Sequence, residues 1–253
     1  LSLHDFRLPS MPEKMFFNLK LIKYFIINQS FTQNTNMPAL KTCTLFRKTV
    51  GIILLITLFS IHIQAQTTAL FDGKSLTGWK TANPTDANLW SVADSTIKCG
   101  DGVNKIPANT FLHTTKEYED FEFRCLFRLT GDPQTGMINS GIQYRSFVKN
   151  GDMIGYQADI GDGYWGDIYD EHRRGKLAGG DLSTLRHVLH KDGWNSYIIR
   201  CKGNKHELYI NGVKTSDYIE KDASIPRKGV IAVQIHSGGA AQIEFRDLTI
   251  SAL

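Results

Sequence analysis

The chain has 253 residues, enough for one large all-β domain or two ordinary domains. Hydrophobic residues make up 42% and charged residues 21%, which is typical of a globular protein and excludes a disordered or fibrous one. The net charge of +4 arises in residues 1–65, which hold 7 Lys/Arg and 2 Asp/Glu, whereas residues 66–253 hold 22 and 23. The basic excess therefore lies outside the main part of the chain and does not indicate a nucleic-acid-binding protein.

Residues 37–65 have the layout of a secretory signal peptide. Three basic side chains precede an apolar run over residues 50–63, and Ala65 provides a small residue at the expected cleavage position. The run is shorter than the roughly 20 apolar residues of a membrane-spanning helix, which favours a cleaved signal over a retained anchor. We therefore expect a periplasmic or secreted protein without a transmembrane span in its mature form.

Of the two segments that flank this signal, only the one that follows it is predicted to fold. Residues 1–36 precede Met37, where a signal peptide is expected to begin, and we interpret them as an over-extended start without structure. Residues 66–253 are expected to form one domain. Export implies an oxidising compartment, yet this part has three cysteines, and both Cys125 and Cys201 lie in alternating apolar strands. Buried thiols are therefore predicted, and a disulfide framework is not.

From Gln66 onward the chain is predicted to consist of strands and turns, without a sustained helical period. Alternating apolar and polar residues predict strands over 121–129, 140–147, 194–202, 206–210, 230–236 and 242–250. Asn211-Gly212 suits a type I′ turn and predicts a hairpin at that point. Many short antiparallel strands indicate two packed sheets, so we predict an all-β sandwich of the jelly-roll kind. The expected core includes Phe123, Cys125, Phe127, Ile199, Val233 and Ile235, with Phe71 and Trp79 closing the N-terminal strand.

Three predicted strands carry a pair of polar side chains on the face opposite their apolar residues, because residues i and i+2 share a face. The pairs are Gln143 with Arg145, Gln157 with Asp159, and Gln234 with His236. A solvated sheet face would explain any one pair. Small neighbours (Gly141, Gly155 and Ala232) leave room above this face, and planar hydrogen-bonding groups match vicinal hydroxyls. The set therefore predicts one concave surface for a polyhydroxylated ligand.

The segment 159–174 is dense in carboxylates, aromatic residues and glycine, as is typical of a functional loop. Three of its aromatic residues can stack on a sugar ring: Tyr164, Trp165 and Tyr169. Three of its polar residues can do acid–base chemistry: Asp170, Glu171 and His172. The alternative is that Asp and Gly only mark turns and Tyr169 belongs to the core.

Other chemistries find little support in the sequence. The segment lacks the spacing of a calcium loop, and the possible metal ligands have no diagnostic spacing: Asp159, Asp162, Asp170 and His236. We therefore predict no cofactor and leave a divalent metal open. The nearby carboxylates do not have the arrangement of an ordinary glycosidase pair, and no nucleophile elbow or phosphate loop occurs.

A series of motifs in fixed order resembles a known family. The motifs lie at 70–79 (LFDGKSLTGW), 118–124 (YEDFEFR), 139–145 (NSGIQYR), 155–159 (GYQAD), 194–197 (WNSY), 229–236 (GVIAVQIH) and 243–250 (IEFRDLTI). Over nearly all of 69–253 the chain resembles the 3-keto-disaccharide hydrolase domain family. The resemblance implies a concanavalin-type jelly roll, exported by bacteria, that cleaves glycosides already oxidised at C3. After His236 the family often has Gly-x-Pro-type residues, whereas this chain has Ser237-Gly-Gly-Ala-Ala-Gln242.

The implied reaction needs one base, an enolate stabiliser and an acid. A ketone at C3 acidifies the C2 proton, the enolate expels the group on C1, and water can then add. By this resemblance His236 fits the base, with an unperturbed pKa of about 6.5, and Arg145 fits the keto oxygen. Asp159, Asp170 or Glu171 would orient the base or protonate the leaving group, while Asn139, Gln143, Gln157 and Gln234 hold hydroxyls. The alternatives are a non-catalytic carbohydrate-binding module on the same surface and a surface adhesion domain.

Overall fold

The computed structural model describes residues 66–180 and 182–253, and the predicted signal peptide and the segment before it lie outside this range. The first of two antiparallel sheets contains β1 (Thr68–Ala69), β3 (Trp90–Ala93), β4 (Thr96–Gly100), β6 (Phe121–Asp132), β11 (Asn195–Lys202), β12 (Lys205–Ile210), β13 (Val213–Ile219) and β15 (Ala240–Ala252). Its strand order is β13-β12-β11-β6-β15-β4-β3, and β1 pairs with β15.

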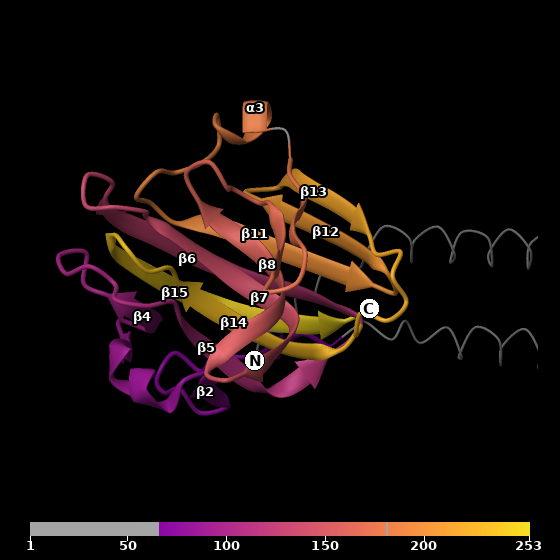
Figure 1. Ribbon diagram of the computed structural model, residues 1–253, viewed down its shortest axis with the longest axis horizontal. Helices are drawn as coiled ribbons and strands as arrows, with labels where there is room; N and C mark the ends of the chain where they lie inside the picture. The colour runs from indigo at the N-terminus through magenta and orange to yellow at the C-terminus, as the bar shows by residue number, and fades with distance from the viewer. Residues whose placement is uncertain (1–65, 181) are drawn as a thin grey trace, which may run out of the picture. The chain divides into compact units, whose positions relative to one another are not determined.

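The second sheet contains β2 (Trp79–Thr81), β5 (Thr110–Tyr118), β7 (Asn139–Lys149), β8 (Asp152–Gly161), β9 (Ile168–Glu171), β10 (Gly175–Ala178) and β14 (Gly229–Ile235). Its strand order is β10-β9-β8-β7-β14-β5-β2. The described residues add two short helical turns, η2 (Pro84–Leu89) and α3 (Leu182–Leu185), and no helix among them could cross a membrane. Figure 1 shows the two sheets as layers, which confirms the predicted all-β sandwich.

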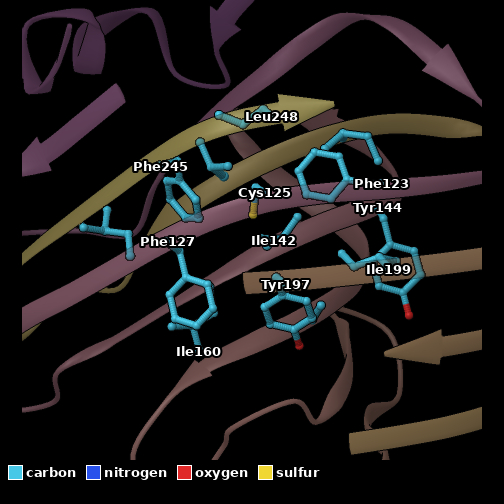
Figure 2. Close-up of a cluster of buried hydrophobic side chains, with 14 of the residues drawn as sticks. Phe123, Cys125, Phe127, Ile142, Tyr144, Ile160, Tyr197, Ile199, Phe245 and Leu248 are labelled. Carbon is cyan, nitrogen blue, oxygen red and sulfur yellow. The ribbon is translucent and has the colours of Figure 1, made fainter. Parts of the chain in front are cut away.

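Alternation along the strands builds the core between the sheets. In β6, Phe123, Cys125 and Phe127 are buried while the residues between them face outward. Figure 2 shows them together with residues of the facing strands, such as Ile142 and Tyr144 of β7. The remaining predicted core residues (Ile199, Val233 and Ile235) are also buried, as are Phe71 and Trp79. The indole N–H of Trp79 donates to the Leu70 carbonyl at 2.7 Å. Replacing a buried Phe by Ala in such a core costs about 3–5 kcal/mol.

Two local predictions are confirmed and one is wrong. Asn211 and Gly212 both have positive φ (48° and 80°) between paired β12 and β13, which is the geometry of a type I′ turn. The three described cysteines are free and buried. The segment 159–174, predicted as a loop, instead contains the end of β8 and all of β9. Pairing of Ile168 with Ala158 extends the sheet through this segment, so its side chains alternate between two faces.

Candidate functional site

A pocket opens on the outer face of the second sheet, where the start of β7 lies beside the ends of β8 and β14. It is lined by Met137, Asn139, Gln157, Asp159, Tyr164, Tyr169, Glu171 and His236. The register explains the convergence, because Gln157 pairs with Gln143 on one side and with Tyr169 on the other. Seven of the residues singled out in the sequence therefore line this one pocket. Met137 was not among them, because a single Met in a connecting segment carries no pattern.

His236 presents one unbonded ring nitrogen. Its Nδ1 lies 2.8 Å from the carbonyl oxygen of Ser237, and a carbonyl can only accept, so Nδ1 carries the hydrogen of the neutral ring. Nε2 is then the basic nitrogen. The backbone N–H of His236 donates to the Asn139 carbonyl at 3.0 Å, which holds the residue beside the start of β7. The ring is oriented to take up a proton at Nε2.

The Asp159 carboxyl group is almost fully buried, with 4% of the residue exposed. Burial raises its pKa to about 7, and the carboxylates of Asp167 and Glu171 add to this rise. Gln157 Nε2 donates to Asp159 Oδ1 at 2.6 Å and opposes it. Asp159 can therefore both hold and release a proton near neutral pH.

Glu171 is the second carboxyl group of the pocket. Burial raises its pKa, an effect that His172 and His236 oppose. Its backbone position pairs with Gly155, four residues from Asp159 on β8. At about 3.3 Å per residue, the two acidic positions are roughly 13 Å apart along the strand direction. Both side chains nevertheless line the same pocket, and the Glu171 carboxylate contributes to the raised pKa of Asp159.

Arg145 does not face the pocket, contrary to the period-two prediction. A bulge between Tyr144 and Phe147 interrupts the pairing of β7 with β8, and Arg145 has a φ of 48°. Such a bulge re-aims side chains. The guanidinium group is buried and donates to the carbonyls of Glu119 and Gly203 at 2.7–2.9 Å. Arg145 therefore ties β7 to the β5–β6 connection and to the turn between β11 and β12.

Close to Arg145, the buried His206 is an acid-sensitive point of the core. Burial and the Arg145 charge lower its pKa from 6.5 to about 3, and its Nε2 has no hydrogen-bond partner among the described residues. The unfolded chain therefore takes up this proton first, so His206 costs no stability well above pH 6.5 and lowers the stability increasingly as the pH drops towards 3.

When the pH is lowered from 7 to 4.5, the unfolding free energy of the parent should fall. We expect the fall to be smaller by about 2 kcal/mol in a His206→Leu variant. The leucine cannot titrate, whereas His206 must stay neutral in the folded state. Urea unfolding at the two pH values measures the difference. An identical loss in both proteins would contradict this account of His206.

Asp170 and Trp165 also lie away from the pocket. Asp170 is fully buried on the core face of β9 and forms ion pairs with Arg173 and Arg174, at 2.6 and 2.5 Å. It is thus held in a structural network, because adjacent residues of a strand point to opposite faces. Trp165 packs against Phe127 and lines a separate, mostly apolar pocket at the end of the sandwich.

Gln143 and Gln234 share the pocket's face of the sheet but are fully buried beneath it. The sequence analysis predicted that the small residues beside them leave room for a ligand above this face, and this prediction is wrong. A Cβ on Gly141 would lie 2.6 Å from Gln157 Cδ, and one on Gly155 would overlap Ser146 Oγ. The protein's own side chains fill this space, and both amide atoms of Gln234 lack partners among the described residues.

The four residues considered as metal ligands do not converge. Asp159 and His236 line the pocket, Asp162 lines the neighbouring apolar pocket, and Asp170 is bound to two arginines. Within residues 66–180 and 182–253, no group of three or more His, Cys, Asp or Glu side chains is arranged to hold a metal ion.

Two antiparallel sheets with a polar pocket on one outer face define a jelly-roll-like sandwich. The sequence model of the 3-keto-alpha-glucoside-1,2-lyase-like domain matches residues 66–251, and the chain belongs to this family. The family confirms the resemblance found in the motifs and gives the chain a carbohydrate-related function. No curated protein sequence matches the chain closely enough to count as a relative.

Several solved structures share the fold. A candidate glycosyl hydrolase from Parabacteroides distasonis ATCC 8503 is 21% identical with a TM-score of 0.55, over 74% of this chain and 94% of that one. The carbohydrate-binding module CBM66 from Bacillus subtilis is 14% identical with a TM-score of 0.52, over 69% and 96%. A Bacillus subtilis protein with a galectin-like fold is 9% identical with a TM-score of 0.55, over 74% and 94%. At these identities the likeness concerns the fold alone.

Proposed function

We propose that the domain cleaves glycosides that carry a ketone at C3, by removing the C2 proton and eliminating the group on C1. One observation carries the proposal: a single pocket holds a histidine with an unbonded Nε2 and a carboxyl group whose pKa is about 7. Membership of the 3-keto-alpha-glucoside-1,2-lyase-like family supports the same substrate class.

The first step is the transfer of the C2 proton to Nε2 of His236. The C2–H electron pair becomes the C2=C3 bond of an enolate, and the former ketone oxygen takes the negative charge. The contact of Nδ1 with the Ser237 carbonyl fixes the tautomer and also stabilises the imidazolium that forms. A single base is sufficient here because the ketone has already acidified the C2 proton.

The second step needs an acid for the leaving group, and Asp159 fits this role. The enolate re-forms the C3 ketone, a C1=C2 bond forms, and the C1–O bond breaks as the departing oxygen takes the Asp159 proton. A carboxyl group of ordinary pKa would already be ionised at pH 7, whereas the buried Asp159 still holds its proton in part of the molecules. If water then adds to C1 and a proton returns to C2, the net reaction is hydrolysis.

The oxygen at C3 needs hydrogen-bond donors, and Arg145, expected from the resemblance, does not reach the pocket. The lining residues Asn139 and Tyr169 offer an amide N–H and a phenol O–H instead. We propose that they stabilise the enolate oxygen, since donors aimed at a developing charge lower the barrier. Gln157 and Tyr164 are the other lining residues able to bind hydroxyls or stack on the ring.

The test compares substrates that differ only at C3. We expect the protein comprising residues 66–253 to release the aglycone from 3-keto-trehalose or a 3-keto-aryl-glucoside and to leave the unoxidised parents intact. Deuterium at C2 should slow the release where proton removal limits the rate. Cleavage of the unoxidised parents would point to an ordinary glycosidase. Binding without cleavage of any of these compounds would favour a carbohydrate-binding module.

We also propose that the domain acts in the periplasm or outside the cell, on the strength of the signal-peptide pattern in residues 37–65. Expression of the full chain in a Gram-negative host, followed by fractionation and N-terminal sequencing, tests this. A mature N-terminus near Gln66 in the periplasmic fraction is the expected result. Retention of the whole chain in the cytoplasm would contradict it.

A further inference from the structure

We infer that Gln143 and Ser146 are positioning residues that act through Gln157 to orient the Asp159 carboxyl group. Neither lines the pocket, and both are buried beneath it, with 0% and 1% of the residue exposed. The inference deepens the proposed function, because it concerns the acid of that reaction. One measurement that tests it, the titration of Asp159, does not depend on enzymatic activity.

The four side chains form a continuous chain of hydrogen bonds. Ser146 Oγ donates to Gln143 Oε1 at 2.9 Å, and Gln143 Nε2 donates to Gln157 Oε1 at 2.8 Å. Gln157 Nε2 then donates to Asp159 Oδ1 at 2.6 Å. Each amide thus accepts on one side and donates on the other, and every donated hydrogen points towards Asp159. Buried polar chains of this kind are rigid, because breaking one link leaves a buried partner unsatisfied.

The direction of this chain decides which Asp159 oxygen carries the proton. Oδ1 accepts from Gln157, so in the neutral acid the hydrogen belongs on Oδ2. Among the described residues no group bonds to Oδ2, and it is not one of the enclosed polar atoms without a partner. Oδ2 is therefore the oxygen that faces the pocket, where a leaving group would take the proton.

The bulge in β7 explains why Ser146 can begin the chain. The interruption between Tyr144 and Phe147 turns Arg145 away and brings Ser146 to the face that carries Gln143. Its Oγ also lies 3.0 and 3.2 Å from the carbonyl oxygens of Tyr144 and Tyr156, which can only accept and therefore compete with Gln143 for the single hydroxyl hydrogen. Gly155 provides the room on the adjacent strand, since a Cβ there would overlap the hydroxyl. The bulge in β7 thus turns Arg145, a predicted ligand-binding residue, away from the pocket and brings Ser146 into contact with Gln143.

The charged groups that face Asp159 come from several elements. Asp167 and Glu171 raise its pKa and Lys176 lowers it, while His236 faces it across the same pocket. The substitutions tested below change none of these charges. A change in the Asp159 titration would therefore report the loss of the Gln157 hydrogen bond and not a change in the surrounding charge.

The test uses Gln143→Met and Ser146→Ala, which remove a polar link with little change in volume. Ser140→Ala is the matched control: Ser140 is a fully buried serine of the same strand, bonded to the Gln234 carbonyl at 2.6 Å and not to the chain. The Asp159 titration is followed by carboxyl carbon-13 NMR and assigned by its loss in Asp159→Asn. We expect Gln143→Met to raise the Asp159 pKa by about one pH unit or more, because Gln157 is no longer held in the orientation in which it donates to the carboxylate.

Kinetics with a 3-keto-glycoside give the second readout. Gln143→Met should lower kcat about tenfold with little change in KM, because the acid is misplaced while the pocket lining is intact. The alkaline limb of the kcat profile, which reports loss of the Asp159 proton, should move to higher pH. Ser146→Ala should shift both quantities in the same direction by less, and Ser140→Ala should leave them unchanged.

The inference is overturned if the Asp159 titration in folded Gln143→Met and Ser146→Ala matches that of the parent. It is also overturned if Ser140→Ala causes the same shift as Ser146→Ala. If Gln143→Met does not fold, Ser146→Ala, which loses a single hydroxyl, decides the question. If no 3-keto-glycoside is cleaved by the parent, the proposed function fails, while the titration still decides whether the chain orients Asp159.

Discussion

Replacing His236 with glutamine is expected to lower kcat/KM on a 3-keto-glycoside by about 10²–10⁴-fold, the usual contribution of a general base. Glutamine preserves size and hydrogen bonding but cannot take up the C2 proton. Because the backbone N–H of His236, which bonds to the Asn139 carbonyl, is retained, the fold and most ligand binding should persist. Steady-state release of the aglycone, together with a binding isotherm for the same compound, measures both effects.

His113 offers a matched control for this substitution. It lies on β5, next to β14, and its Nδ1 contacts the carbonyl oxygen of the following residue at 2.9 Å, as in His236. It does not line the pocket, so His113→Gln should leave kcat/KM unchanged. Normal turnover by His236→Gln would place the base elsewhere, and Glu171, with its raised pKa beside the same pocket, would be tested next.

Asp159→Asn is expected to abolish leaving-group protonation and, at the same time, to stabilise the fold at alkaline pH. The folded-state pKa of about 7 lies above the value of 3.8 for an unperturbed Asp. The folded protein therefore holds this proton more tightly, so the contribution of Asp159 to stability is greatest below pH 3.8 and falls as the pH rises through 7. Above pH 7 the buried charge costs on the order of 2–4 kcal/mol, which asparagine avoids.

Two measurements separate these effects. Denaturant unfolding at pH 8 should show a higher free energy of unfolding for Asp159→Asn than for the parent, and the difference should shrink towards pH 4. Turnover of a 3-keto-glycoside with a poor leaving group should fall more than turnover with a good one, because only the poor leaving group needs the acid. Equal stability at pH 8, or equal losses with both leaving groups, would contradict the role given to Asp159.

Much of the fold could be predicted because the governing pattern is local. The alternation in β6 predicts that Phe123, Cys125 and Phe127 share the buried face, since neighbouring strand residues point in opposite directions. The type I′ turn at Asn211-Gly212 is equally local, because both residues tolerate positive φ. The same rule correctly predicts that Gln157 and Asp159 share a face.

Tertiary pairing decided the rest of the site. Asp170 and Glu171 are neighbours in the sequence, yet pairing of β9 with β8 sends Glu171 to the pocket and Asp170 to the opposite face, where two partly exposed arginines bind it. The short β9 was missed because a segment rich in Asp and Gly is typical of a loop, and only its neighbour β8 supplies the hydrogen bonds that make it a strand.

Alternation along single strands was enough to predict the sandwich, its core and a polar face with His236, Asp159 and Gln157, because it needs no knowledge of neighbouring strands. Two features of the site depend instead on how the strands pair: Arg145 leaves this face, and Gln143 supports Asp159 from beneath the pocket. Arg145 is turned away at the bulge in β7, where the pairing with β8 skips Arg145 and Ser146, whereas Gln143 reaches Gln157 because the two residues pair across these strands. A bulge is a mismatch between paired strands, so the strand's own alternation does not reveal it.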